Sequence, residues 1–158
     1  MTPSGDAAGD RFPPPLITLV AVLIGVLLQR LAPMNILPDD LRVIGREIGW
    51  IVLVLAIALG VWSVGLFARA GTTWNPVRPT TALVLHGPYR FTRNPMYLAF
   101  AIDMAGIALI TNNLWILLMI IPDVVGTRVL QIDREERYLS AKFGAEYDAY
   151  RAKVRRWI

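Results

Sequence analysis

Four runs of apolar residues divide the chain into blocks that short polar segments separate. The second run, Ile48 to Phe67, holds twenty residues without a charge, about the length that an α-helix needs to cross a bilayer core. The third run is short, so we expect its helix to tilt or to form part of a submerged hairpin. The pattern predicts an all-α, polytopic integral membrane protein with about four transmembrane helices, over residues 16–31, 48–67, 96–110 and 114–130.

Polar and turn-forming residues mark the ends of these predicted helices. Pro33 and the sequence "LPDD" follow the first run, and Asn112 and Asn113 separate the third from the fourth. Asparagine tolerates turn geometry, so we expect a tight helix–helix turn there. Residues 1–15 are polar and rich in Pro and Gly, which predicts a disordered or weakly held lead rather than a cleaved signal peptide.

Apolar and aromatic residues also recur at steps of three and four after the fourth run. This spacing predicts one face of an amphipathic helix at the cytoplasmic membrane surface, with an interruption at Gly144. Its apolar face comprises Leu139, Phe143, Tyr147, Tyr150 and Val154.

Composition supports the membrane interpretation and excludes several kinds of site. The chain is 55% hydrophobic, has a mean hydropathy of +0.49, and contains one histidine and no cysteine. It therefore has no disulfide and no cysteine nucleophile, and we expect no metal site. The net charge of +4 comes from basic residues beside the apolar runs, a distribution that does not indicate nucleic-acid binding.

The basic residues predict the orientation of the chain in the membrane. They lie without acidic residues between the second and third runs, and they are numerous after the fourth run. By the positive-inside rule both segments are cytoplasmic. An even number of spans then places the N-terminus and the C-terminus in the cytoplasm. The basic residues in question are Arg69, Arg78, Arg90, Arg93, Arg134, Arg137, Lys142, Arg151, Lys153, Arg155 and Arg156.

The stretch "HGPYRFTRNPMYLAF", residues 86–100, concentrates polar and conformationally restricted residues at the start of the third helix. Pro95 suits the first turn of a helix, and Asn94 before it is expected to cap that helix. Free N–H groups at a helix N-terminus and the guanidinium groups of Arg90 and Arg93 favour a carboxylate or phosphate. Simple anchoring of the helix at the membrane surface is the alternative explanation.

Four acidic residues are candidates for chemistry. Glu135 and Glu136 follow the fourth run, where we expect a carboxylate at the cytoplasmic surface to face the bundle, although a solvated charge run is the simpler explanation. Asp103 and Asp123 lie within predicted spans, where a carboxylate is costly. Each either lines a cavity for a polar substrate or pairs with a neighbouring helix, and we favour the pairing.

Two motifs on either side of the predicted hairpin give the chain a family resemblance. "GPYRFTRNPMYL" and, about forty residues later, "EERYLSAKFGAEYDAYRAKVRRW" resemble the isoprenylcysteine carboxyl methyltransferase family. That family belongs to a wider group of membrane methyltransferases that includes phospholipid methyltransferases. The resemblance covers roughly Pro76 to Trp157 and implies one methyltransferase domain, residues 16–158, with cofactor motifs at 86–97 and 135–157.

The resemblance implies S-adenosylmethionine as cofactor, bound at the cytoplasmic side. Where the family has histidine this chain has Asn94, which cannot act as a base near neutral pH. The implied cofactor-binding residues, with His86 added as a possible substitute for that histidine, are His86, Gly87, Pro88, Tyr89, Arg90, Arg93, Asn94, Pro95, Tyr97, Glu135 and Glu136.

The predicted function is methyl transfer to a lipophilic small molecule, a lipid or an isoprenylcysteine-like carboxylate. Arg93, Glu135 and Lys153 are the candidate catalytic residues: Arg93 orients an acidic acceptor and Glu135 deprotonates an amine. Membrane lipids and the lipophilic acceptor are the expected partners. The alternatives are a non-catalytic membrane module that binds anionic lipid or a partner protein through its basic surface, and a small transporter, which the lack of repeats disfavours.

Overall fold

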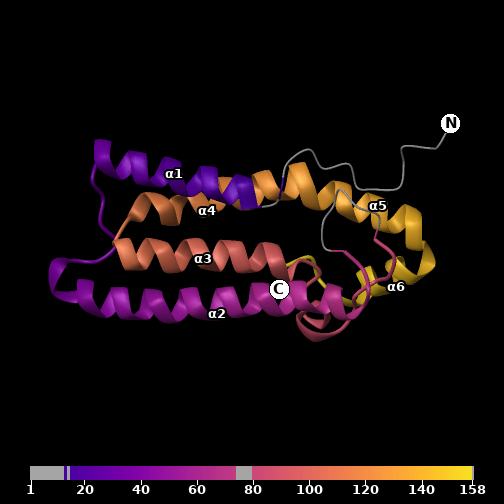
Figure 1. The fold of residues 1–158 in the computed structure, drawn as a ribbon. Coiled ribbons are helices and arrows are strands. Elements are labelled where there is room, and N and C mark those ends of the chain that lie inside the picture. The colour runs from indigo at the N-terminus through magenta and orange to yellow at the C-terminus, as the bar shows by residue number, and fades with distance from the viewer. Residues whose placement is uncertain (1–12, 14, 74–79, 158) are drawn as a thin grey trace.

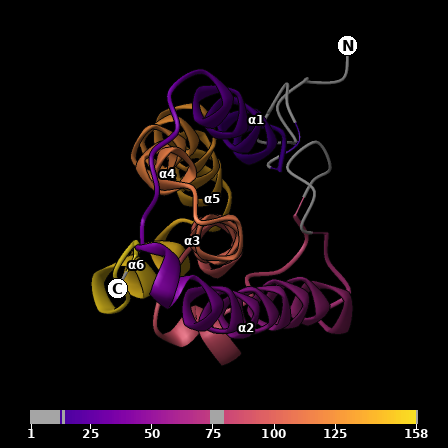
Figure 2. The ribbon, with the colours of Figure 1, turned by 90° about the vertical axis from the view of Figure 1, so that its left-hand side faces the viewer.

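The computed structural model describes residues 13, 15–73 and 80–157, and within them every regular element is a helix. The all-α prediction is therefore confirmed for these residues. Most of the predicted lead, as well as Pro76 and Arg78, lies outside the described residues. The four long helices are α1 (Pro15–Leu31), α2 (Arg42–Arg69), α3 (Pro95–Thr111) and α4 (Leu114–Thr127). They lie side by side along one direction, with α3 between α2 and α4 and with α1 against α4 (Figures 1 and 2).

Helix length and composition agree with part of the predicted topology. Two helical segments, Asp39–Arg69 and Leu114–Phe143, are long and apolar enough to cross a membrane. The apolar helices α1 and α3 have 17 residues each, which gives them a length of about 25 Å at 1.5 Å per residue. Large apolar side chains remain exposed on the outer surface, among them Leu23, Leu55, Val61 and Ile121. Such a surface suits membrane association, and four spans stay a prediction.

The close packing of α2 against α3 depends on two glycines. A Cβ at Gly106 would lie 3.0 Å from the carbonyl oxygen of Gly49, and a Cβ at Gly49 would lie 2.9 Å from the carbonyl oxygen of Gly106. The two backbones therefore touch at this crossing, as membrane helices with small interface residues commonly do.

The turn between α3 and α4 forms as the sequence predicts. Asn112 adopts the left-handed conformation, with φ of 48°, and Asn113 caps α4 by accepting a hydrogen bond from the Ile116 amide at 3.2 Å. Asn112 Oδ1 also accepts hydrogen bonds from the amides of Ile36 and Leu37, at 3.1 and 2.9 Å. The two loops at this end of the bundle are thus joined.

At the other end, α4 continues into two shorter helices. A five-residue π-helical segment, η3 (Arg128–Ile132), leads into α5 (Asp133–Phe143), and α6 (Ala145–Lys153) follows after Gly144, whose φ is 52°. The predicted interruption at Gly144 is confirmed. The single turn η2 (Gly87–Arg90) and the last residues of the chain lie at this end as well (Figure 1).

Candidate functional site

A narrow cavity lies where the residues before α3 meet α5 and α6. Its polar lining comes from both predicted motifs: Tyr89, Arg93 and Asn94 from the first, and Glu135 and Glu136 from the second. The structure thus brings together five of the residues that the sequence selected, although they are about forty positions apart in the chain. Its apolar lining includes Phe67, Leu83, Val84 and Leu139.

Apart from Nη1 of Arg93, which forms an ion pair with Glu136 at 3.4 Å, two buried polar atoms on the cavity wall have no hydrogen-bond partner among the described residues. They are the hydroxyl of Tyr89 and Nε of Arg93. Burial raises the pKa of Tyr89 well above its ordinary value, and the Glu135 carboxylate adds to that rise. The hydroxyl therefore stays protonated and able to donate. Because buried donors are rarely left unpaired, both atoms indicate a ligand with acceptor oxygens.

Glu135 and Tyr97 join the cavity to α3. The hydroxyl of Tyr97 donates a hydrogen bond to Oε2 of Glu135 at 3.2 Å, and the Tyr97 ring is buried. Glu135 lies on the cavity wall, whereas the Tyr97 side chain belongs to a separate groove between α2 and α3. This pair thus links the two spaces.

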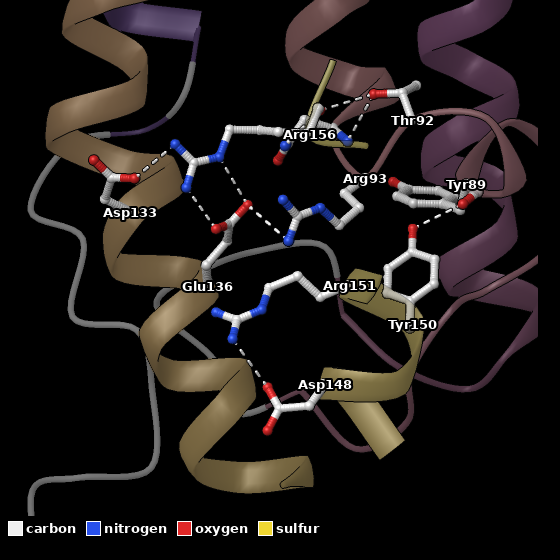
Figure 3. Close-up of polar contacts among 10 residues, drawn as sticks. Tyr89, Thr92, Arg93, Asp133, Glu136, Asp148, Tyr150, Arg151 and Arg156 are labelled. Carbon is white, nitrogen blue, oxygen red and sulfur yellow. Dashed lines mark hydrogen bonds and ion pairs between the residues drawn. The ribbon is translucent and has the colours of Figure 1, made fainter. Parts of the chain in front are cut away.

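Glu136 has a different environment from Glu135, because two arginines already pair with it. Nη2 and Nε of Arg156 lie 2.7 and 3.1 Å from its two carboxylate oxygens, and Nη1 of Arg93 lies 3.4 Å from Oε1 (Figure 3). Arg156 also pairs with Asp133 at 3.1 Å. Glu136 is 8% exposed and the Arg93 side chain 11%, so this pair is largely shielded from water, whereas Arg156 and Asp133 are partly exposed. Its geometry joins the end of the chain to α5.

Asn94 takes part in the same anchoring, and its predicted capping role is wrong. The helix α3 does begin at Pro95, but the Asn94 side chain makes no capping hydrogen bond. Instead its Nδ2 donates to the carbonyl oxygen of Arg156 at 2.9 Å. The Thr92 hydroxyl donates to the same oxygen at 3.0 Å (Figure 3). A tertiary partner thus replaces the local cap.

The remaining predicted residues lie away from the cavity lining. His86 is exposed, and Pro88 and Pro95 are buried in the fold. Gly87 has a φ of 64° and sits against α2, where a Cβ would lie 2.7 Å from a methyl carbon of Leu66. Arg90 and Lys153 line a shallow depression beside Tyr150, on the other side of α6 from Glu136. Their roles in binding or catalysis stay predictions.

The structure also adds aromatic residues from α5 and α6 that the sequence did not select as site residues. Tyr138, Tyr147 and Tyr150 line the cavity, and the Tyr150 hydroxyl donates to the carbonyl oxygen of Tyr89 at 2.7 Å (Figure 3). The periodicity of the amphipathic segment identified Tyr147 and Tyr150 as one face. It gave no sign that this face covers a cavity rather than lipid.

The cavity is small in this structure, with a volume of about 50 Å³. That is room for one or two water molecules. Binding a nucleoside-sized ligand therefore requires lining segments such as residues 80–85 to move outward, a change common in ligand-binding loops.

Comparison with known proteins identifies the larger group. A family model described as "Phospholipid methyltransferase" matches residues 44–146, more than half of the chain. An "Uncharacterized protein" of Haemophilus influenzae is 40% identical over 63 residues, which is 40% of this chain and the whole of that relative. No solved structure matches. The family match includes Arg93, Glu135 and Glu136 but ends before Lys153 and Arg156.

Proposed function

The chain belongs to the phospholipid methyltransferase family, and from this premise we propose that it is an S-adenosylmethionine-dependent enzyme that methylates a lipophilic acceptor at the membrane surface. The family implies methyltransferase activity in general. The observation that supports the finer proposal is that Arg93 and Glu135 line one cavity together with Tyr89, whose hydroxyl is buried.

The donor set of the cavity matches the chemistry of this cofactor. Arg93 offers a buried N–H without an acceptor, which suits the carboxylate of the amino-acid part. Glu135 is an acceptor for the ammonium of the same part. Apolar and aromatic side chains, such as Leu139 and Tyr147, would enclose the adenosine. When bound, the cofactor would supply a methyl group on a positively charged sulfur.

The residues of this chain would then bind and align rather than form covalent bonds. Arg93 and Glu135 would fix the amino-acid end, and the apolar wall would exclude water from the reacting atoms. The Glu135–Tyr97 hydrogen bond lies between the cavity and the membrane groove. We therefore place the methyl acceptor on the membrane side of Tyr97. An amine acceptor must also lose a proton, for which Glu135 is the nearest carboxylate on the cavity wall.

Binding of S-adenosylmethionine to the purified protein in micelles tests the proposal. Isothermal titration calorimetry should detect binding, and Glu135→Gln should weaken it at least about tenfold, as expected for loss of a hydrogen-bonded charge. Glu146→Gln is the matched control, because Glu146 is an exposed acid on α6 outside the cavity lining. Folded protein that binds no cofactor up to millimolar concentration would refute the proposal.

A non-catalytic module that recognises anionic lipid through its basic surface is the second candidate. The observation in its favour is the exposure of Arg90 and Lys153 on one depression. Flotation compares binding of the protein to vesicles of pure phosphatidylcholine and to vesicles with added phosphatidylserine, and together with the calorimetry it distinguishes the module from the enzyme. If Arg90→Gln with Lys153→Gln abolishes a preference for phosphatidylserine while calorimetry detects no cofactor, the module is the better description.

A further inference from the structure

A second, larger space lies between α2 and α3, on the membrane side of the candidate site. This groove has a volume of about 520 Å³, within the usual range for sites that bind small molecules. Among the described residues, its lining is apolar except for Asp103 and the hydroxyl of Tyr97. Gly60 and Gly65 of α2 face Tyr97, Phe100 and Asp103 of α3 across it.

Two glycines of α2 keep this groove open. A Cβ at Gly65 would meet no atom within 4 Å, and a Cβ at Gly60 would meet only the Cβ of Ala99, at 3.6 Å. Neither glycine is therefore required for the helices to approach each other. Gly49 and Gly106 differ, because a Cβ at either would lie within 3.0 Å of the facing backbone. The helices thus touch at the level of Gly49 and Gly106 and leave a space at the level of Gly60 and Gly65.

Asp103 gives the groove its chemical specificity. Its Oδ1 is buried and has no hydrogen-bond partner among the described residues. The other acid within a predicted span, Asp123 of α4, accepts a hydrogen bond from the hydroxyl of Thr18 in α1 at 3.0 Å. The pairing with a neighbouring helix that the sequence analysis favoured for both acids is therefore found for Asp123 but not for Asp103. A buried carboxylate oxygen without a donor is costly. Because the Asp103 residue also lines the groove, a molecule bound there can supply a donor to its carboxylate.

The relative positions of Tyr97 and Asp103 set the spacing that such a molecule must satisfy. They are six residues apart on α3, which corresponds to about 9 Å along the helix axis. Tyr97 marks the end next to Glu135, where we place the methyl acceptor atom. Asp103 therefore lies beside the chain of the acceptor rather than beside its reacting end.

We propose that the α2–α3 groove binds a single-chain lipophilic acceptor. This molecule carries a hydroxyl or amine about 9 Å from its methylated atom, and that group donates a hydrogen bond to Asp103. The assignment as acceptor rests on the proposed function; the binding of such an amphiphile does not. A plain hydrocarbon chain would fill the same groove but leave the Asp103 oxygen unpaired.

Because the chain contains no cysteine, a single introduced cysteine allows a direct measurement of binding. Gly60→Cys places a thiol in the groove without a steric conflict, and its rate of modification by N-ethylmaleimide reports occupancy. Hexane-1,6-diol, 6-aminohexan-1-ol and hexan-1-ol serve as probes, because the first two add a donor at the far end of the same chain, at about the proposed spacing from the first hydroxyl. Ala58→Cys, on the exposed outer face of α2, is the control position.

We expect the diol or the amino alcohol to protect Gly60→Cys at a concentration at least about tenfold lower than hexan-1-ol does. Asp103→Leu should abolish this difference, and Asp103→Asn, which keeps an acceptor oxygen, should retain part of it. Whichever of the two probes is stronger identifies the donor. Equal protection by all three probes in the native sequence would overturn the role of Asp103. No protection, or equal protection of Ala58→Cys, would overturn the groove as a specific site.

These measurements need no cofactor and no turnover, so their failure is distinguishable from failure of the proposed function. If S-adenosylmethionine binds but the probes do not, the enzyme takes its acceptor elsewhere. If the probes bind but the cofactor does not, the groove is a lipid-binding site in a protein without methyl transfer.

Discussion

At the residue scale, Asn94 shows how a substitution within a motif can change the role of a position. Its amide donates to the carbonyl oxygen of Arg156, a neutral hydrogen bond that does not titrate. We predict that Asn94→Ala lowers the free energy of unfolding by about 1 kcal/mol, the usual net value of one such bond. Thermal unfolding in micelles measures this. Asn35→Ala is the control, because the hydrogen bond of Asn35 to Gln29 is exposed and long, at 3.4 Å.

The buried tyrosines of the candidate site predict a loss of stability at alkaline pH. Burial raises the pKa of Tyr147 to about 12, with the Glu136 carboxylate as the next cause. The unfolded chain releases this proton near pH 10 and the folded chain near pH 12, so the stabilisation is complete below pH 10 and is lost as pH rises toward 12. The free energy of unfolding should fall by up to about 1.4 kcal/mol per pH unit from this group.

Denaturant titrations at several pH values above neutrality check this decline. In Tyr147→Phe the free energy of unfolding should fall less steeply with pH but should still fall, because burial also raises the pKa values of Tyr89 and Tyr150. An unchanged slope in Tyr147→Phe would show that Tyr147 ionises equally in both states and is not buried as described.

At the scale of elements, the crossing of α2 and α3 makes a prediction that separates glycines with different roles. Gly106→Ala should destabilise the bundle by about 1–3 kcal/mol, because its Cβ would meet the backbone of α2 at 2.9 Å and backbone cannot easily yield. Gly60→Ala on α2 should be neutral or slightly stabilising, because alanine has a higher helix propensity than glycine. Thermal unfolding of both variants in the same detergent tests the contrast, and equal losses would contradict it.

The attachment of the chain end to α5 gives a second prediction at this scale. Removing Glu136 leaves Arg93 and Arg156 without their shared carboxylate, and loss of one partner of a shielded ion pair typically costs about 3 kcal/mol. Glu136→Ala should therefore be strongly destabilising and should loosen residues 154–157. Asp148→Ala removes an exposed ion pair with Arg151 and should cost less than about 1 kcal/mol.

Hydrogen exchange provides the structural measurement for this pair of variants. The amide of Arg93 donates to the carbonyl oxygen of Arg155 at 3.0 Å, so its protection reports the attachment of the chain end. Protection should fall in Glu136→Ala and stay unchanged in Asp148→Ala. If Glu136→Ala keeps both stability and protection while cofactor binding is lost, Glu136 is a ligand residue, as the resemblance implied.

The helices were predictable where local signals and tertiary contacts agree. Pro95 begins α3, the two asparagines end it, and Gly144 separates α5 from α6, because backbone conformation is decided within a few residues. The role of Asn94 was not predictable, because its partner is 62 positions away. The same holds for residues 80–85, which form part of the cavity wall without any motif.

At the scale of the whole molecule, the two ends of the bundle differ in chemistry. One end holds the α1–α2 connection and the α3–α4 turn, joined by Asn112. The other holds η2, α5 and α6 (Figure 1), whose residues line the candidate site. The motifs selected from the sequence for their basic charge thus gather at a single end, which is the distribution that the positive-inside rule associates with the cytoplasm.

This polarity yields a topology prediction that the cysteine-free chain makes testable. Single cysteines at the exposed positions Asp40 and Lys153 should lie on opposite sides of the membrane, because they belong to opposite ends of the bundle. A membrane-impermeant maleimide added to intact cells should label Asp40→Cys and leave Lys153→Cys unmodified until the membrane is permeabilised. Labelling of both cysteines in intact cells would contradict the prediction that the bundle crosses the membrane. The reverse pattern would place the candidate site outside the cell, where little S-adenosylmethionine is expected, and would argue against the proposed enzyme as strongly as a failure to bind the cofactor.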